Sequence, residues 1–254
     1  MRILLSGCCG RMGRVITGIA NNREDCEVVA GLDRVLDPNL PFPVFANSAD
    51  CDVDYDVLID FSNPSALPGV IDLSKRTGKP LVVATTGLSE RETADLNRLS
   101  QTNAVFTSAN MSLGINILIK LARDAAKTLY PDFNIEIIEA HHNQKVDAPS
   151  GTALMIADEI KDALDDEAVF YRYERQSFRE KRVANEIGIS AIRGGTIVGE
   201  HDVMFAGSQE VLTIKHSAQS REVFGEGAIA AALFLHGKKP GHYDMNDLIS
   251  ASID

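Results

Sequence analysis

The segment Ile3-Leu-Leu-Ser-Gly-Cys-Cys-Gly-Arg-Met-Gly13 decides the fold of the chain. It begins as a short, mainly apolar run typical of a buried strand, continues with a glycine at every third position, and leads into helical spacing of apolar residues. Strand, glycine turn and helix in this order let the backbone approach a pyrophosphate at the helix N-terminus. A tight turn without a ligand has the same pattern. The residues expected at a dinucleotide are Gly7, Cys8, Cys9, Gly10, Arg11 and Met12.

A carboxylate follows the next predicted strand, Cys26–Leu32. Asp33 stands twenty residues after Gly13, the spacing at which an acid binds the ribose hydroxyls of a dinucleotide. The guanidinium of Arg34 could pair with a 2′-phosphate, although an exposed loop arginine looks the same in a sequence. Together the two residues predict use of both NADH and NADPH.

Strand-like and helix-like segments alternate up to Met111. Strands are expected over 56–61, 80–84 and 104–107, helices from the residue after the turn at 62–64 to residue 76 and over 90–100, and a proline-containing surface loop over 36–49. Such alternation predicts a doubly wound parallel sheet, which binds ligands at the carboxyl ends of its strands. Ordinary turns are the alternative. The residues expected near the nicotinamide are Ala84, Thr85, Thr86, Ser108, Ala109, Asn110 and Met111.

The middle of the chain has a different pattern, which predicts a second, α+β domain. An amphipathic helix over 112–129 precedes a strand over 134–139, a helix over 152–160 and a charged loop over 171–182. Strands over 187–193, 195–198, 201–205 and 210–216 then suggest a mostly antiparallel sheet. Helical spacing returns over 221–236, and a short element closes the chain at 244–249.

The loop between strand 134–139 and helix 152–160 concentrates titratable side chains. Ser150 is a candidate N-cap, so the amides of Gly151 and Thr152 would face a carboxylate, with His142 and Lys145 completing the anion site. His141 is the expected proton donor, because imidazole titrates near neutral pH. Lys145 could donate a proton or stabilise negative charge. Two adjacent histidines also suit a solvated loop or, less well, a metal site, and no metal is expected.

Composition narrows the class of protein. The 254 residues carry a formal net charge of −11, which argues against general binding of nucleic acid. No apolar run reaches the length of a membrane span, and Met1 leads directly into a strand, so a soluble cytoplasmic protein without a signal peptide is expected. The four cysteines fall in the first fifth of the chain without Cys-x-x-Cys spacing, which predicts reduced side chains.

The run His141-His-Asn-Gln-Lys-Val-Asp-Ala-Pro-Ser-Gly-Thr152 resembles the signature of the dihydrodipicolinate reductases. Further family segments occur in order at Gly7–Gly13, Asp33-Arg34, Ala84–Gly87, Ser108–Met111 and Arg193–His201. The resemblance implies NAD(P)H-dependent reduction of a cyclic dicarboxylate, 4-hydroxy-tetrahydrodipicolinate or its dehydrated form, to tetrahydrodipicolinate on the diaminopimelate route to lysine. It also implies a homotetramer, a dinucleotide-binding domain over 1–111 and 221–254, and a substrate-binding and oligomerisation domain over 112–220.

Two other functions fit parts of the sequence. A dehydrogenase acting on a semialdehyde or an amino acid would share the first 110 residues but should lack the anion-binding loop. A nicotinamide sensor would need an element that binds DNA or a protein partner, and the sequence shows no basic recognition helix.

Overall fold

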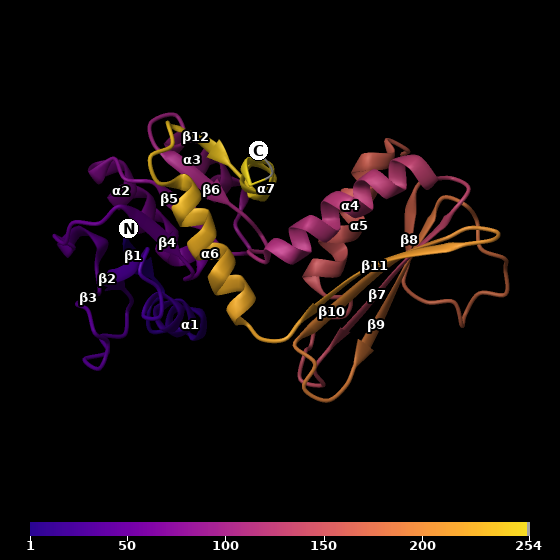
Figure 1. The fold of residues 1–254 in the computed structure, drawn as a ribbon, viewed down its shortest axis with the longest axis horizontal. Coiled ribbons are helices and arrows are strands. Elements are labelled where there is room, and N and C mark those ends of the chain that lie inside the picture. Colours follow the sequence, from indigo (N-terminus) through magenta and orange to yellow (C-terminus); the bar gives the residue numbers. More distant parts are fainter. Residues whose placement is uncertain (253–254) are drawn as a thin grey trace. The chain divides into compact units, whose positions relative to one another are not determined.

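The chain divides into two compact units in the computed structural model, which describes residues 1–252. The first unit contains Met1–Leu113 together with the segment from Arg221 onward, and the second contains Gly114–Ser220. Figure 1 shows a helix-flanked sheet in each unit. Among the described residues, no helix is both long and apolar enough to cross a membrane.

The first unit is built on a parallel sheet of seven strands, which confirms the predicted doubly wound fold. Its order is β12-β6-β5-β4-β1-β2-β3. The strands are β1 (Arg2–Ser6), β2 (Glu27–Leu32), β3 (Val44–Phe45), β4 (Val57–Asp60), β5 (Leu81–Val83), β6 (Ala104–Thr107) and β12 (Gly241–Tyr243). Strands β2 and β3 lie on one side of β1 in the sheet, and β4, β5 and β6 follow one another on its other side. The direction of winding therefore reverses between β1 and β4, the point at which doubly wound sheets bind ligands.

Helices cover both faces of this sheet because its strands carry apolar side chains on both faces. One face packs against α1 (Arg11–Ala20), α6 (Glu222–Leu235) and α7 (Met245–Ala251) through a core that includes Leu5, Ile16 and Ile229. The other packs against α2 (Leu67–Thr77) and α3 (Glu90–Leu99). Two short 3₁₀ helices, η1 (Ser48–Asp50) and η2 (Pro64–Ala66), precede α2.

The second unit has a mixed five-stranded sheet in the order β11-β10-β7-β9-β8. Its elements are α4 (Leu113–Leu129), β7 (Asn134–His141), α5 (Gly151–Leu164), β8 (Phe170–Arg172), β9 (Glu186–Arg193), β10 (Gly199–Ala206) and β11 (Val211–Ala218). Strand β10 pairs antiparallel with β7 and β11, whereas β9 pairs parallel with β7 and β8. Helices α4 and α5 pack on one face, over a core that includes Ile137 and Phe205.

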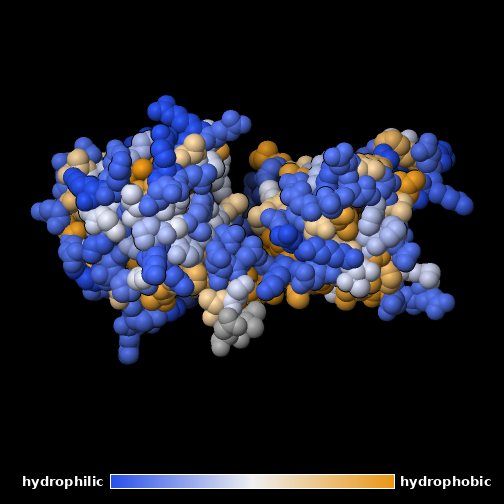
Figure 2. All heavy atoms as spheres, turned by 90° about the horizontal axis from the view of Figure 1, so that it is seen from above, coloured by the Kyte–Doolittle hydropathy of each residue, from blue (hydrophilic) through white to orange (hydrophobic). Residues whose placement is uncertain are grey.

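Apolar side chains remain exposed on the second unit. Ile192 of β9 is 51% exposed, and Val211 and Leu212 of β11 are 58% and 43% exposed. Figure 2 shows that hydrophobic residues take a larger share of the visible surface on this unit than on the first. Exposed apolar side chains are a feature of many subunit interfaces.

The expected strand over 195–198 is wrong, because Gly195 and Thr196 form a turn and residues 197–198 are irregular. Gly195 has φ +50°, a left-handed conformation that ends an extended run. The turn holds the histidine loop instead: Gly194 N–H donates to His141 O over 2.9 Å, and Asn143 N–H donates to Gly195 O over 3.2 Å. The pattern also missed β3, β8 and β12, whose two or three residues are too few for a periodic signal.

Candidate active site

The histidine loop joins the end of β7 to the start of α5. Alternation along β7 places Ile135, Ile137, Glu139 and His141 on the buried face of the strand. Ser150 is the N-cap of α5, as predicted, and its hydroxyl accepts from Ala153 N–H over 3.1 Å. The loop is therefore fixed at both ends by regular structure.

A buried carboxylate orients the first histidine. Glu139 has no exposed surface, and its Oε2 lies 2.6 Å from His141 Nδ1. A carboxylate can only accept, so Nδ1 carries the hydrogen and Nε2 is the remaining titratable atom of the ring. Gly199 keeps space beside Nε2, since a Cβ at this position would lie 3.1 Å from it.

Arg193 holds the same carboxylate from the neighbouring strand. Its Nη2 lies 2.7 Å from Glu139 Oε1 and its Nη1 lies 2.8 Å from Oε2, a bidentate arrangement. Ser150 N–H also donates to Oε1 over 3.0 Å. Burial alone would raise the pKa of Glu139, but the hydrogen bonds from Arg193 and His141 outweigh it and lower the pKa. Glu139 is thus a fully paired, ionised group.

A third imidazole, that of His201, packs against the ring of His141. The rings of His141 and His201 are 5.3 Å apart and nearly perpendicular, and His201 Nε2 lies 3.1 Å from Ser150 Oγ. Burial, with the neighbouring His141 adding to it, lowers the pKa of His201 to about 4. His201 is therefore neutral near pH 7 and supports the loop without adding charge.

A carboxylate of the same chain, that of Asp147, already lies beside the predicted anion site. Lys145 Nζ lies 2.9 Å from Asp147 Oδ2. The hydrogen bond from Lys145, together with a smaller effect of the Gly151 backbone, lowers the pKa of Asp147. Gly151 is exposed, Thr152 and His142 are half-buried, and His142 Nδ1 has no hydrogen-bond partner in the described structure. The loop thus offers a cation and a helix N-terminus to a carboxylate.

In the first unit, a cavity of about 430 Å³ lies at the carboxyl ends of β1, β2 and β4. Its lining includes Gly7, Gly10, Asp33 and Arg34 from the predicted cofactor set. Gly7 has φ +80°, and an added Cβ would lie 2.5 Å from Phe61 O. A Cβ at Gly13 would lie 2.3 Å from Gly7 O, so only glycine lets α1 begin this close to the turn. The cavity, the glycine turn and the helix N-terminus fit a dinucleotide phosphate.

Asp33 is half-buried at the mouth of this cavity. Its Oδ2 accepts from Cys9 N–H over 3.0 Å and its Oδ1 from Val35 N–H over 3.1 Å. Arg34 is exposed, and Arg11 and Met12 lie in the first turn of α1 outside the lining. Cys8 is fully buried, and burial raises the pKa of its thiol to about 12. Cys8 is therefore a neutral thiol in the free protein, and the groups it offers to a dinucleotide are those of its backbone.

The residues expected near the nicotinamide lie just after the last residues of β5 and β6. Thr85 is buried, and its hydroxyl donates to Asp60 Oδ2 over 2.7 Å, while Thr86 is exposed. Burial raises the pKa of Asp60, which also accepts from Ser62 Oγ over 2.5 Å. Ser108 is half-buried and Ala109 exposed, whereas the side chains of Ala84, Asn110 and Met111 are buried. Ala84 and Met111, the two apolar residues among them, can contact a ligand chiefly through backbone atoms.

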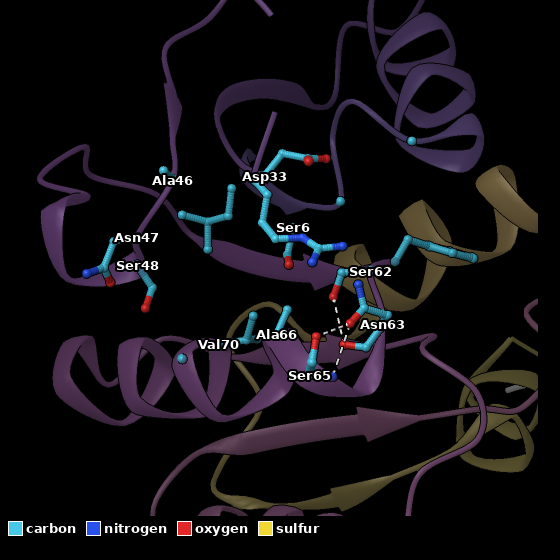
Figure 3. Close-up of a pocket in the computed structure, with 16 residues that line it drawn as sticks. Ser6, Asp33, Ala46, Asn47, Ser48, Ser62, Asn63, Ser65, Ala66 and Val70 are labelled. Carbon is cyan, nitrogen blue, oxygen red and sulfur yellow. Dashed lines mark hydrogen bonds between the residues drawn. The ribbon is translucent and has the colours of Figure 1, made fainter. Parts of the chain in front are cut away.

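Sequence reasoning missed one wall of the cavity and most of the support for His141. The missed wall comes from η1 and from the turn after β4, and Figure 3 shows it facing Ser6 and Asp33. Its residues are Asn47, Ser48, Ser62, Asn63, Ser65 and Ala66. Asn63 is the N-cap of η2 and accepts from Ser65 N–H over 3.1 Å, a polar turn signal that was available in Ser62-Asn63-Pro64.

Comparisons with known proteins cover both units. Sequence models described as "Dihydrodipicolinate reductase, N-terminus" and "Dihydrodipicolinate reductase, C-terminus" match residues 1–111 and 114–249. The chain is 53% identical over 249 residues to the 4-hydroxy-tetrahydrodipicolinate reductase of Caldanaerobacter subterraneus subsp. tengcongensis, with 98% of each chain covered. It is 51% identical over 251 residues to that of Clostridium tetani, covering 99% of this chain and 98% of the relative.

A solved structure has the same arrangement of elements. The dipicolinate-bound dihydrodipicolinate reductase of Paenisporosarcina sp. TG-14 matches with a TM-score of 0.82 and 26% identity, covering 97% of this chain and 98% of that one.

Proposed function

The chain belongs to the dihydrodipicolinate reductase family, and from this premise we propose how it uses the residues described above. It is an oxidoreductase that reduces 4-hydroxy-tetrahydrodipicolinate, or its dehydrated form, to tetrahydrodipicolinate with NAD(P)H, on the diaminopimelate route to lysine. The observation that carries the mechanism is the buried Glu139 carboxylate on His141 Nδ1, in a loop that also carries an anion site.

The cofactor site is the cavity of the first unit. We assign the pyrophosphate to the turn Gly7–Gly13 and the adenine ribose to Asp33, since the turn lacks the Cβ atoms that would block it. Arg34 is exposed beside Asp33 and can reach a 2′-phosphate, which supports use of both NADH and NADPH. When bound, the dihydronicotinamide supplies a hydride to the substrate.

His141 supplies the proton that the reduced substrate requires. Glu139 keeps Nδ1 protonated and stabilises the imidazolium, so Nε2 carries the transferable proton. Arg193 positions Glu139 and prevents this buried carboxylate from taking the proton itself. Glu139 and Arg193 are positioning residues in this scheme.

The substrate carboxylates bind at the start of α5. Lys145, His142 and the amides of Gly151 and Thr152 supply the donors, and Lys145 also stabilises negative charge that develops during reduction. Asp147 competes for Lys145 in the free protein. A dicarboxylate must therefore displace the Asp147 carboxylate from Lys145 when it binds.

Assembly is proposed from the second unit. The exposed apolar residues on β9 and β11 support a homotetramer formed through this sheet. Cytoplasmic location, and partners limited to small molecules and further copies of the chain, remain predictions from the sequence.

The experiment that tests the function follows the absorbance of NADH and of NADPH with substrate freshly produced by dihydrodipicolinate synthase. Oxidation of cofactor that requires the synthase product supports the proposal. Oxidation of NAD(P)H with a semialdehyde, or reduction of NAD(P)+ with an amino acid, and no activity with the synthase product, would refute it.

A further inference from the structure

Two neighbouring thiols and a carboxylate meet at the turn between β1 and α1. Within residues 1–252, Cys8, Cys9 and Asp33 are the one group of three Cys, His, Asp or Glu side chains whose ligand atoms all lie within 4.8 Å of each other. The two Sγ atoms are 3.9 Å apart. The mechanism proposed above uses the carboxylate but neither thiol.

Local packing holds these groups in place. Cys8 has no exposed surface and lies against Gly31, where an added Cβ would be 2.3 Å from Cys8 Sγ. Cys9 is half-buried, and its thiol donates to Val35 O over 3.0 Å. The Asp33 carboxylate is fixed by the amides of Cys9 and Val35. One thiol is thus anchored in the core while the second thiol and the carboxylate reach partial exposure.

The spacing of the sulfurs suits a tetrahedral metal ion. Two thiolates about 2.3 Å from one Zn²⁺ at tetrahedral angles are roughly 3.8 Å apart. The observed separation of 3.9 Å is close to this value. Asp33 can supply an oxygen after a small side-chain rotation, since its nearest carboxylate atom already lies within 4.8 Å of both sulfurs. Two sulfurs and one oxygen leave a fourth position for water.

We propose that Cys8, Cys9 and Asp33 form a binding site for a thiophilic divalent cation such as Zn²⁺. The donor set of two thiolates and one carboxylate selects Zn²⁺ and similar ions over Mg²⁺ and Ca²⁺, which prefer oxygen ligands. Binding forms two metal–sulfur bonds, and each thiol releases its proton to solvent, without any change of oxidation state.

The site has a consequence for the cofactor. Asp33 and the amides of the glycine turn are the groups assigned above to the dinucleotide, so a metal ion held there competes with NADH. This part of the inference rests on the proposed cofactor site. Metal binding itself does not, and it can be measured without cofactor or substrate.

The test uses Co²⁺ as a probe, because thiolate ligands give this ion a charge-transfer absorption that water and carboxylates do not. The reduced wild-type protein should bind one Co²⁺ per chain with this absorption, and added Zn²⁺ should abolish it. Cys9→Ser should lose most of the band and bind at least about tenfold more weakly, whereas Asp33→Asn should keep the band with affinity reduced about tenfold. Cys51→Ala removes a buried thiol elsewhere and should match the wild type.

The absence of the charge-transfer band in the wild type, or an equal band in Cys9→Ser, would overturn the site. Competition is then measured by NADH fluorescence. Zn²⁺ should raise the apparent Kd for NADH in the wild type in proportion to its concentration, and the same rise in Cys9→Ser should require at least about tenfold more Zn²⁺. A Zn²⁺-independent Kd in the wild type would overturn the competition, while failure of NADH to bind at all would count against the cofactor site instead.

Discussion

His141 Nδ1 lies 2.6 Å from Oε2 of Glu139, a carboxylate without exposed surface. Four donors converge on Glu139: two guanidinium nitrogens, one imidazole and one backbone amide. This pairing compensates for the loss of hydration of a buried charge and leaves His141 one orientation. Strand register creates it, because Arg193 is paired with His141 across β9 and β7, and His201 with Glu139 across β10 and β7.

Glu139→Gln should lower kcat about 10²-fold and change KM little, because the amide cannot stabilise an imidazolium as the carboxylate does. The basic limb of the kcat profile should move to lower pH for the same reason. Glu136→Gln is the matched control, since Glu136 lies on the same strand but pairs with Arg175 and Arg182. A Glu139→Gln enzyme with wild-type kcat at every pH would remove Glu139 from the mechanism.

Asp147→Asn should lower KM for the dicarboxylate by up to about fivefold, because the competing partner of a partly exposed Lys145 is removed. Lys145→Ala should do the opposite and raise KM. Steady-state kinetics at saturating NADH measure both, with Asp132→Asn as an exposed control on the same unit. A higher KM in Asp147→Asn would show that Asp147 assists binding and does not compete with the substrate.

Arg34→Ala should reduce kcat/KM for NADPH about tenfold, equivalent to roughly 1.4 kcal/mol, and leave NADH within about twofold. In the wild type the two cofactors should differ by no more than about an order of magnitude. The measurement is kcat/KM with each cofactor at saturating substrate. Equal losses for both cofactors would place Arg34 outside the 2′-phosphate site.

Stability should fall as the pH drops through the window set by His201. Its pKa is about 4 in the folded protein and near 6.5 when unfolded, so the unfolded state binds more protons between these values. The free energy of unfolding should fall by up to about 3 kcal/mol from pH 6.5 to pH 4. The charged and titratable groups that act on this imidazole are His141, Glu139, His216 and Lys145.

His201→Asn should remove this part of the pH dependence in urea unfolding. Ser150→Ala is the matched control: it loses the hydroxyl beside His201 and an N-cap, which costs about 1 kcal/mol, but keeps the imidazole and hence the slope. A slope that survives in His201→Asn would assign it to another group.

The sequence predicted the elements with strong periodicity and the residues with a distinctive local pattern. The glycine turn, Asp33 and the Ser150 N-cap could each be predicted from residues close together in the sequence, because their geometry depends on local backbone structure. Arg193 stands far along the chain from Glu139, and only the parallel register of β7 and β9 brings them together. The cavity wall formed by serine and asparagine side chains was also missed because it depends on contacts between distant segments. It forms where η1 and the turn after β4 pack beside β1.

The steady-state kinetics of His141→Gln, with the dicarboxylate varied at saturating NADH, test the role of His141 as proton donor. If His141 donates the proton, kcat should fall about 10²–10⁴-fold, while KM for the dicarboxylate stays within about threefold of the wild type. The Kd for NADH should also be unchanged, because the proposed cofactor site lies in the first unit. A His141→Gln enzyme with wild-type kcat would contradict the mechanism and leave His141 with a structural role.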